Sequence, residues 1–134
     1  MRAVLESDPD FMLRTGYTYS GHPTACAAGL ANIDIIEREQ LLGESQRIGR
    51  RLGDGLEAVA ADGGIDHVRG LPAIHAAGLR ADQNALVVRD AMMRHGVITR
   101  PIGTDTLTFC PPLVTTDEQV DRIVDALAAA VAES

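Results

Sequence analysis

Two residues of this chain, Thr18 and Arg100, have side chains that can bind anions. The neighbouring residues of each are expected to leave its side chain accessible. Thr18 lies just before a helix that Pro23 is expected to begin. A hydroxyl beside the free backbone N–H groups of a helix start forms a cradle for phosphate. Arg100 precedes Pro101, which favours an extended backbone and projects the arginine from a strand end. A guanidinium matches a carboxylate with two parallel hydrogen bonds. The alternatives are an ordinary helix-start threonine and a surface arginine in a salt bridge.

The basic residues of the chain are all arginine, and there is no lysine. Codon bias in a GC-rich genome explains the pattern, since alanine and glycine are also plentiful. Whatever its origin, the absence of lysine means that this chain alone cannot carry out a mechanism that needs a lysine amine for a Schiff base or for proton transfer. We therefore assign no catalytic residue.

The histidines and cysteines give no metal or nucleophile pattern. His22 and Cys26 stand four apart on a predicted helix, but nothing nearby completes a tetrahedral set, so we expect no metal site. We expect His75, in a predicted strand, to be a hydrogen-bonded structural residue. Cys26 and Cys110 lack C-x-x-C spacing, which favours two buried, reduced thiols in a cytosolic protein.

The elements that must position these residues begin with an incoming loop over residues 1–19, followed by two predicted helices. The first runs from Pro23 to Arg38, and its first half carries small side chains on every face, so we expect that half to be buried. The second spans Leu41 to Ala61 and ends at Asp62-Gly63-Gly64. Its arginines, Arg47, Arg50 and Arg51, are expected on a solvated face.

The remainder alternates short strands with helices. We expect strands over Ile65–Val68, Ala73–Leu79, Val97–Thr99 and Thr106–Cys110, and the stretches Arg69–Pro72 and Pro101–Asp105 are expected to connect them. A helix is predicted over Asn84–His95, with Gly96 as its carboxyl-terminal cap. Thr116 and Gln119 fit a capping box for a last helix. The C-terminal half of the chain is therefore predicted to be a compact α/β unit of about four short strands with helices packed on the sheet.

Length and charge exclude several classes of function. The chain has 134 residues, 46% of them hydrophobic, and a net charge of −7. One domain of this size can hold a real core. An acidic surface repels phosphate backbones, so we expect no nucleic-acid partner. There is no apolar run of about 18 residues and no signal-peptide pattern at the start, so we expect no membrane association and a cytoplasmic location.

Two blocks of sequence resemble class III pyridoxal-phosphate (PLP) aminotransferases, the group that includes the omega-transaminases. The first is GYTYSGHPTACAAGLANIDIIERE, residues 16–39, and the second is HGVITRPIGTDTLTFCPPLVTTDEQVDRIVDAL, residues 95–127. Both occur in the family's order and spacing and together cover most of the chain. The resemblance implies the C-terminal third of a transaminase, since the family's cofactor lysine and the aspartate that pairs with its pyridine nitrogen lie upstream of the first block.

The resemblance implies a fold and roles for named residues. The expected fold class is α/β, the C-terminal small domain of a fold-type I PLP aminotransferase, with a short, mainly antiparallel sheet, helices packed on it and a long N-terminal helix before it. The expected divisions are residues 1–22, an incoming loop with the phosphate-contact motif, residues 23–61, two linking helices, and residues 62–134, the small domain. Thr18 would contact the PLP phosphate of the neighbouring subunit in a homodimer, and Tyr17 would line that pocket. Arg100 would pair with a substrate carboxylate.

The implied reaction moves an amino group between an amino acid or amine and a keto acid or aldehyde. We expect this chain alone to bind no PLP and to be inactive, because it supplies no lysine. Thr15, where many members have histidine, could alter the loop that meets the partner subunit, and Pro72, where glycine is common, would stiffen a turn. Two alternatives remain open: a non-catalytic, freestanding α/β domain that self-associates through its first helix, and one half of a split enzyme whose partner carries the lysine.

Overall fold

The computed structural model describes residues 16–134, which form two compact units, each described by itself. Of the described residues, the first unit holds 16–34 and the second Ile35–Ser134. The departure expected at Thr15 lies outside the described residues. The elements are α2 (Pro23–Arg38), α3 (Leu41–Ala61), β1 (His67–Leu71), β2 (Ile74–Gly78), α4 (Ala85–Arg94), β3 (Arg100–Ile102), β4 (Thr106–Phe109) and α5 (Asp117–Ala132). No described helix is both long enough and apolar enough to cross a bilayer.

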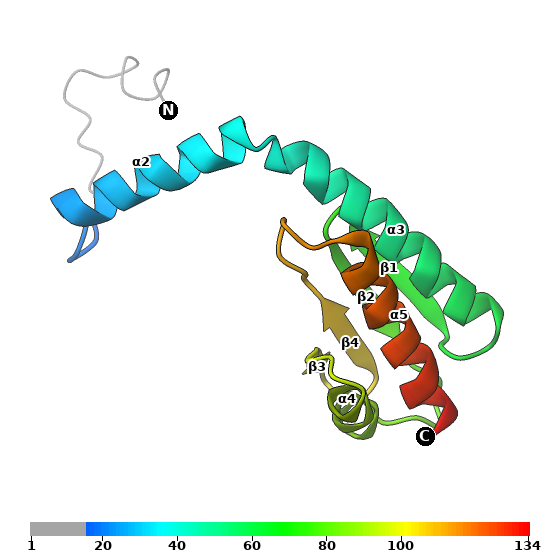
Figure 1. Ribbon diagram of the computed structural model, residues 1–134. Helices are drawn as coiled ribbons and strands as arrows, with labels where there is room; N and C mark the ends of the chain where they lie inside the picture. Colours follow the sequence, from blue (N-terminus) through cyan, green and yellow to red (C-terminus); the bar gives the residue numbers. More distant parts are fainter. Residues whose placement is uncertain (1–15) are drawn as a thin grey trace, which may run out of the picture. The chain divides into compact units, whose positions relative to one another are not determined.

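The four strands form one antiparallel sheet in the order β1-β2-β4-β3. Helix α3 packs on β1 and β2, α4 packs on β3 and β4, and α5 lies against both helices. Figure 1 shows α3 and α5 side by side over the sheet. The expected α/β architecture, with a small antiparallel sheet, helices packed on it and a helix preceding it, is confirmed.

The core lies between the helices and one face of the sheet. Aliphatic side chains dominate it, as a chain without tryptophan requires; fully buried members include Ile48, Leu52, Leu56, Val88, Met92, Leu107, Val120 and Leu127. The buried positions of α3 recur every three or four residues, so one stripe of the helix faces the core. Burying one such side chain contributes about 1.5–3 kcal/mol.

Local signals in the sequence fix several helix ends. The Asn84 side chain accepts a hydrogen bond from the backbone N–H of Leu86 and begins α4. Thr116 and Gln119 form the predicted capping box at the start of α5. Gly96 has a φ of 80°, which suits a glycine after a helix. Gln40, with a φ of 51°, separates α2 from α3. The predicted helix bounds therefore hold to within a residue.

The strand bounds predicted from sequence were less accurate. Residues Arg69 to Leu71, expected in a connection, belong to β1, and the hairpin turn is only Pro72 and Ala73. Val97–Thr99, expected as a strand, precedes β3, which contains Pro101. The backbone N–H of Val97 instead closes the end of α4 by donating to Met92. Pro101 is tolerated because β3 is an edge strand, where one row of N–H groups is not needed for pairing.

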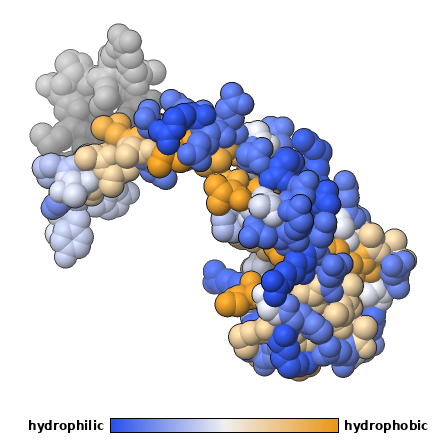
Figure 2. Space-filling model, in the orientation of Figure 1, coloured by the Kyte–Doolittle hydropathy of each residue, from blue (hydrophilic) through white to orange (hydrophobic). Residues whose placement is uncertain are grey.

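Two expectations of burial were wrong. No residue of α2 is buried by the described part of the chain, although its first half was expected to be. Figure 2 shows apolar colours over part of this helix. Cys26 and Cys110 are free thiols, as expected, but both are exposed. Cys26 shares the exposure of α2, and Cys110 follows the last residue of β4, where the chain leaves the sheet.

Candidate functional site

Thr18 lies in a turn that leads into α2. The backbone N–H and the hydroxyl of Ser20 both donate to the carbonyl oxygen of Tyr17, at 2.9 and 2.7 Å, and close this turn. Gly21 follows with a φ of 78°, which an L side chain would rarely adopt. Thr18 is exposed, and so is Tyr17, at 81%. The turn thus leaves a hydroxyl and a phenol exposed in the described part of the chain.

The start of α2 offers backbone donors close in sequence to this turn. The first helical hydrogen bond runs from the N–H of Cys26 to the carbonyl oxygen of His22. The N–H groups of the first helical turn have no partner inside the helix, and Pro23 has no N–H to offer. A hydroxyl and free helix N–H groups are the donors that a phosphate accepts from.

Arg100 is the first residue of β3, and its side chain is exposed. The hydroxyl of Thr108 donates to its backbone carbonyl at 2.9 Å and fixes the strand position. Among residues 16–134 its guanidinium forms no ion pair. A hollow of about 500 Å³ beside it is lined by Ile98, Thr108, Cys110 and Pro112, among others. The arginine is therefore free to bind an external anion.

Sheet register places a second arginine on the same row as Arg100. Arg100 pairs with Thr108, Thr108 with Ala76, and Ala76 with Arg69. Residues directly opposite one another in a sheet share a face. Arg69 was expected in the connection between two strands, so its place on this row was not predicted. Nothing in the sequence alone could show this row, which depends on how four strands align.

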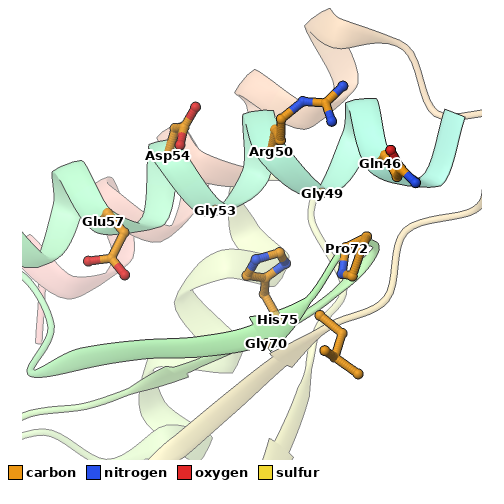
Figure 3. A pocket seen from close by; sticks show the side chains of 10 residues that line it. Gln46, Gly49, Arg50, Gly53, Asp54, Glu57, Gly70, Pro72 and His75 are labelled. Atoms are coloured by element: carbon orange, nitrogen blue, oxygen red, sulfur yellow. The ribbon is translucent and has the colours of Figure 1, made fainter. Parts of the chain in front are cut away.

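His75 lines a different hollow, of about 500 Å³, between α3 and the β1–β2 hairpin. In Figure 3 its ring points from β2 toward Gly53 of α3, with Arg50 between Gly49 and Gly53 and Glu57 farther along the helix. The Nδ1 atom is buried and has no hydrogen-bond partner, so the expectation of a hydrogen-bonded histidine was wrong at this atom. Desolvation lowers the pKa of His75 below its ordinary value of 6.5, and the charge of Glu57 opposes part of that shift.

The site residues predicted from sequence belong to two units. Thr18 and Tyr17 lie in the first unit and Arg100 in the second. Within residues 16–134 there is no group of three or more histidine, cysteine, aspartate or glutamate side chains that could hold a metal ion. The chemistry that these residues offer is anion binding: hydroxyl and N–H donors in the first unit, and guanidinium groups in the second.

Curated relatives of this chain are aminotransferases. It is 40% identical over 123 residues to a diaminobutyrate–2-oxoglutarate transaminase of Halomonas elongata, a match that covers 81% of this chain and 26% of that protein. It is 33% identical over 112 residues to an acetylornithine aminotransferase of Bifidobacterium longum, covering 84% of this chain and 26% of that one. The chain therefore spans about a quarter of the length of these relatives.

Solved structures agree with these relatives in fold. An amine transaminase from an uncultivated Pseudomonas species, in its PLP-bound form, matches with a TM-score of 0.83 at 37% identity over 91% of this chain and 30% of its own. A thermostable omega transaminase variant from Pseudomonas jessenii matches with a TM-score of 0.80 at 33% identity over 90% of this chain and 29% of its own.

The family model for class-III aminotransferases matches residues 3–131, nearly the whole chain. That match takes in both sequence blocks on which the resemblance rested, the turn with Thr18 and the strand with Arg100. The chain belongs to the class-III aminotransferase family.

Proposed function

We propose that this chain is the portion of a PLP-dependent aminotransferase that contributes a phosphate contact and a substrate-carboxylate contact. The enzyme would transfer an amino group between an amino acid or amine and a keto acid or aldehyde, as a homodimer in the cytoplasm. The observation that carries the proposal is Arg100, an exposed guanidinium at a strand end without an ion pair in the described part of the chain, inside a family match over residues 3–131.

The residues present fit one part of a PLP site. The exposed hydroxyl of Thr18 and the free N–H groups at the start of α2 are donors that suit a phosphate dianion. The chain has no lysine, so it cannot supply the amine to which the cofactor would be covalently attached. This division favours a role across a subunit interface, in which Thr18 holds the phosphate of a cofactor anchored by a lysine elsewhere.

Each residue then has a defined task. Thr18 donates its hydroxyl hydrogen to a phosphate oxygen, and Tyr17 covers the adjoining surface and excludes water. Arg100 binds a substrate carboxylate with two parallel hydrogen bonds and so orients the amino or keto carbon. When bound, PLP supplies the electron sink for the chemistry. Proton transfer at the substrate carbon requires a base that this chain does not provide.

Assembly with a lysine-bearing segment tests these roles. The chain would be co-expressed with the preceding segment of a class-III aminotransferase and the complex assayed. Arg100→Gln should raise KM about tenfold for a keto acid and leave KM for an aldehyde unchanged, since the lost interaction is a charge-assisted bidentate pair. Arg89→Gln, on α4, is the matched control. Equal effects on both acceptors would contradict the role of Arg100.

Thr18 is tested in the same complex by its affinity for PLP. Thr18→Ala should weaken PLP binding by about tenfold or more, because one hydrogen bond to a charged oxygen is lost. Thr24→Ala, in the first turn of α2, removes a neighbouring hydroxyl and serves as control. An unchanged affinity in Thr18→Ala would remove the phosphate role.

Inactivity of the isolated chain is part of the proposal. Incubated with PLP and an amino donor, it should show no turnover and no stable visible absorbance band from covalent attachment, because no lysine is present. Turnover by the purified chain would overturn this expectation.

A second candidate, a non-catalytic domain that self-associates, is favoured by the exposure of α2. Leu30 is 69% exposed and Ile33 53%, and α2 has no buried residue. Exposed apolar surface of this kind promotes association. Size-exclusion chromatography over a range of concentrations distinguishes the candidates: a strict monomer excludes self-association, and co-purification with a lysine-bearing chain would identify half of a split enzyme.

A further inference from the structure

The tip of the β1–β2 hairpin, residues 70–75, rests on α3 at two glycines. A Cβ at Gly49 would overlap the carbonyl oxygen of Pro72, and a Cβ at Gly53 would lie 2.9 Å from Nε2 of His75. Gly49 and Gly53 are about one helical turn apart. The hairpin tip therefore lies along one stripe of α3, where the helix has no side chains to hold it off.

Little apolar burial holds the hairpin tip on the helix. Leu71 is 75% exposed and Ile74 59%, because this cross-strand pair points to the face of the sheet opposite to His75. The base of the hairpin is better anchored, since Val68 of β1 packs against the core and Ala77 of β2 is fully buried. Separating the tip alone from α3 thus exposes little apolar surface.

The ring of His75 fills the space between α3 and β1. Its Nε2 faces Gly53, and its Cδ2 lies 2.9 Å from the place of a Cβ at Gly70. Nδ1 is buried and has no hydrogen-bond partner within residues 16–134. A neutral imidazole tolerates this arrangement, because Nδ1 can then be the ring nitrogen that carries no hydrogen. A protonated imidazole does not, because both nitrogens carry a hydrogen and a buried, unpaired donor is costly.

The charged groups around the ring do not supply the missing acceptor. Those that line the hollows next to His75 are Arg50, Asp54 and Glu57 of α3 and Arg69 of β1. In Figure 3 the side chains of Arg50 and Asp54 extend away from the ring. On β4, the residue paired with His75 is Phe109, which does not titrate. Burial lowers the pKa of His75 below its ordinary value of 6.5, and the charge of Glu57 opposes part of that shift.

We infer that protonation of His75 releases the hairpin tip from α3, while the base of the hairpin and the contact between α3 and α5 stay in place. The ring leaves the gap between Gly53 and Gly70 and reaches water, which accepts the hydrogen bonds of both ring nitrogens. The hairpin tip is thus a pH-sensitive device that is closed at neutral pH and open at mildly acid pH. It goes beyond the proposed function, because it involves neither Thr18 nor Arg100.

Nuclear magnetic resonance of the full chain between pH 7.5 and pH 5 tests this inference. The Cε1–H resonance of His75 reports protonation of the ring. A nuclear Overhauser cross-peak between the α protons of Gly49 and Pro72 reports the contact of the hairpin tip with α3. A cross-peak between Gly55 and the methyl groups of Val124 reports the packing of α3 on α5, since a Cβ at Gly55 would lie 2.5 Å from Cγ2 of Val124.

The Gly49–Pro72 cross-peak should disappear with the same midpoint as protonation of the ring, at a pH below 6.5, while the Gly55–Val124 cross-peak remains. Protonation with the Gly49–Pro72 contact intact would overturn the inference, and so would a ring that stays neutral down to pH 5. Loss of both contacts together would show that the whole unit unfolds, which also overturns it.

Removal of the titrating group should lock the hairpin tip. His75→Phe keeps a ring between the two glycines but cannot take up a proton, so it should retain the Gly49–Pro72 cross-peak at pH 5. His22→Gln, outside this contact, is the control and should lose the cross-peak as the parent does. Loss of the cross-peak in folded His75→Phe would contradict the inference, and the titration of the parent decides the matter if this variant does not fold.

The charge of Glu57 gives a second, graded readout. Glu57→Gln removes a carboxylate that favours the protonated ring, so the shared midpoint should move to lower pH. Glu37→Gln, at an exposed position of α2, is the matched control and should leave the midpoint unchanged. Equal midpoints in Glu57→Gln and the parent would remove Glu57 from the device.

Discussion

His75 is the residue where burial and hydrogen bonding conflict. Its ring lies against α3 because Gly53 and Gly70 leave room for it: a Cβ at either position would come within 2.9 Å of a ring atom. The ring atom nearest to Gly53 of α3 is Nε2, and Nδ1 is buried without a hydrogen-bond partner. The neutral imidazole is thereby favoured, and the pKa of His75 is lowered.

The lowered pKa of His75 makes stability depend on pH. Because the folded pKa lies below the unfolded value of 6.5, the unfolded chain binds a proton first, and stability is lost as pH falls below 6.5 toward the folded pKa. The free energy of unfolding, measured by urea denaturation, should therefore decrease from pH 7.5 to pH 5.5. In His75→Phe this decrease should be smaller, whereas His22→Gln, on the exposed turn before α2, should retain it. An equal decrease in both variants would contradict the assignment.

At the scale of elements, glycines decide how closely α3 meets the hairpin. Gly49 is buried, and a Cβ there would lie 1.5 Å from the carbonyl oxygen of Pro72. The obstacle is backbone in a two-residue turn, which cannot move aside as a flexible side chain could. Gly43, in the first turn of the same helix, has nothing within 4 Å of such a Cβ. One helix thus holds a required glycine and an unconstrained one.

Alanine substitution at these two positions should have opposite effects. Gly49→Ala should lower the free energy of unfolding by about 3 kcal/mol or more, because the hairpin must separate from the helix. Gly43→Ala should raise it by about 0.5 kcal/mol, since alanine loses less backbone entropy on folding than glycine. Chemical denaturation measures both. A Gly49→Ala protein as stable as the parent would show that the hairpin does not rest on α3.

The capping box of α5 is a second feature at this scale. Thr116→Ala removes the acceptor for the N–H of Gln119 and should lower the free energy of unfolding by about 1 kcal/mol. Thr104→Ala, at an exposed loop threonine, is the control and should change stability little. Thermal denaturation of the two variants checks the difference, and equal melting temperatures would contradict the cap.

At the scale of the whole molecule, both an ion-pair layer and an apolar layer join α3 to α5. Arg51 donates to both carboxylate oxygens of Asp121 at 2.7 Å, and Arg47 pairs with Asp117. The hydrogen bond to Asp121 raises the pKa of Arg51 and lowers that of Asp121. These side chains are between about a third and a half exposed, and Figure 2 shows mostly polar colours there. Exposed pairs contribute little because water screens them.

The apolar layer should therefore dominate. Leu127→Ala, at a fully buried position, should lower the free energy of unfolding by about 2–5 kcal/mol. Arg51→Ala should produce a much smaller decrease in melting temperature, and that decrease should shrink further when salt is added. A larger loss for Arg51→Ala than for Leu127→Ala would reverse this view of the interface. The arginines of α3, predicted to be only solvated, thus have partners on α5 at two of three positions.

The features that could be predicted from the sequence are those set by interactions between residues close together in the chain. Helix ends at Pro23, Asn84 and Thr116 were predictable because capping and turn chemistry act over three or four residues. The strand ends at Leu71 and Arg100 were not, since a strand extends only as far as its neighbour offers hydrogen bonds. Of the candidate site, the sequence indicated Arg100 but not Arg69, which depends on that pairing.

The sequence by itself determined the family, the order of helices and strands, and the absence of any lysine amine, because residue identity and short-range backbone preference suffice for these. Only the tertiary structure decided which residues meet. It placed Arg69 and Arg100 on one row of the sheet, packed the hairpin against Gly49, and left one nitrogen of His75 without a hydrogen-bond partner. The physical reason is that sheet register is a long-range property, set when the four strands align to bury one shared apolar face.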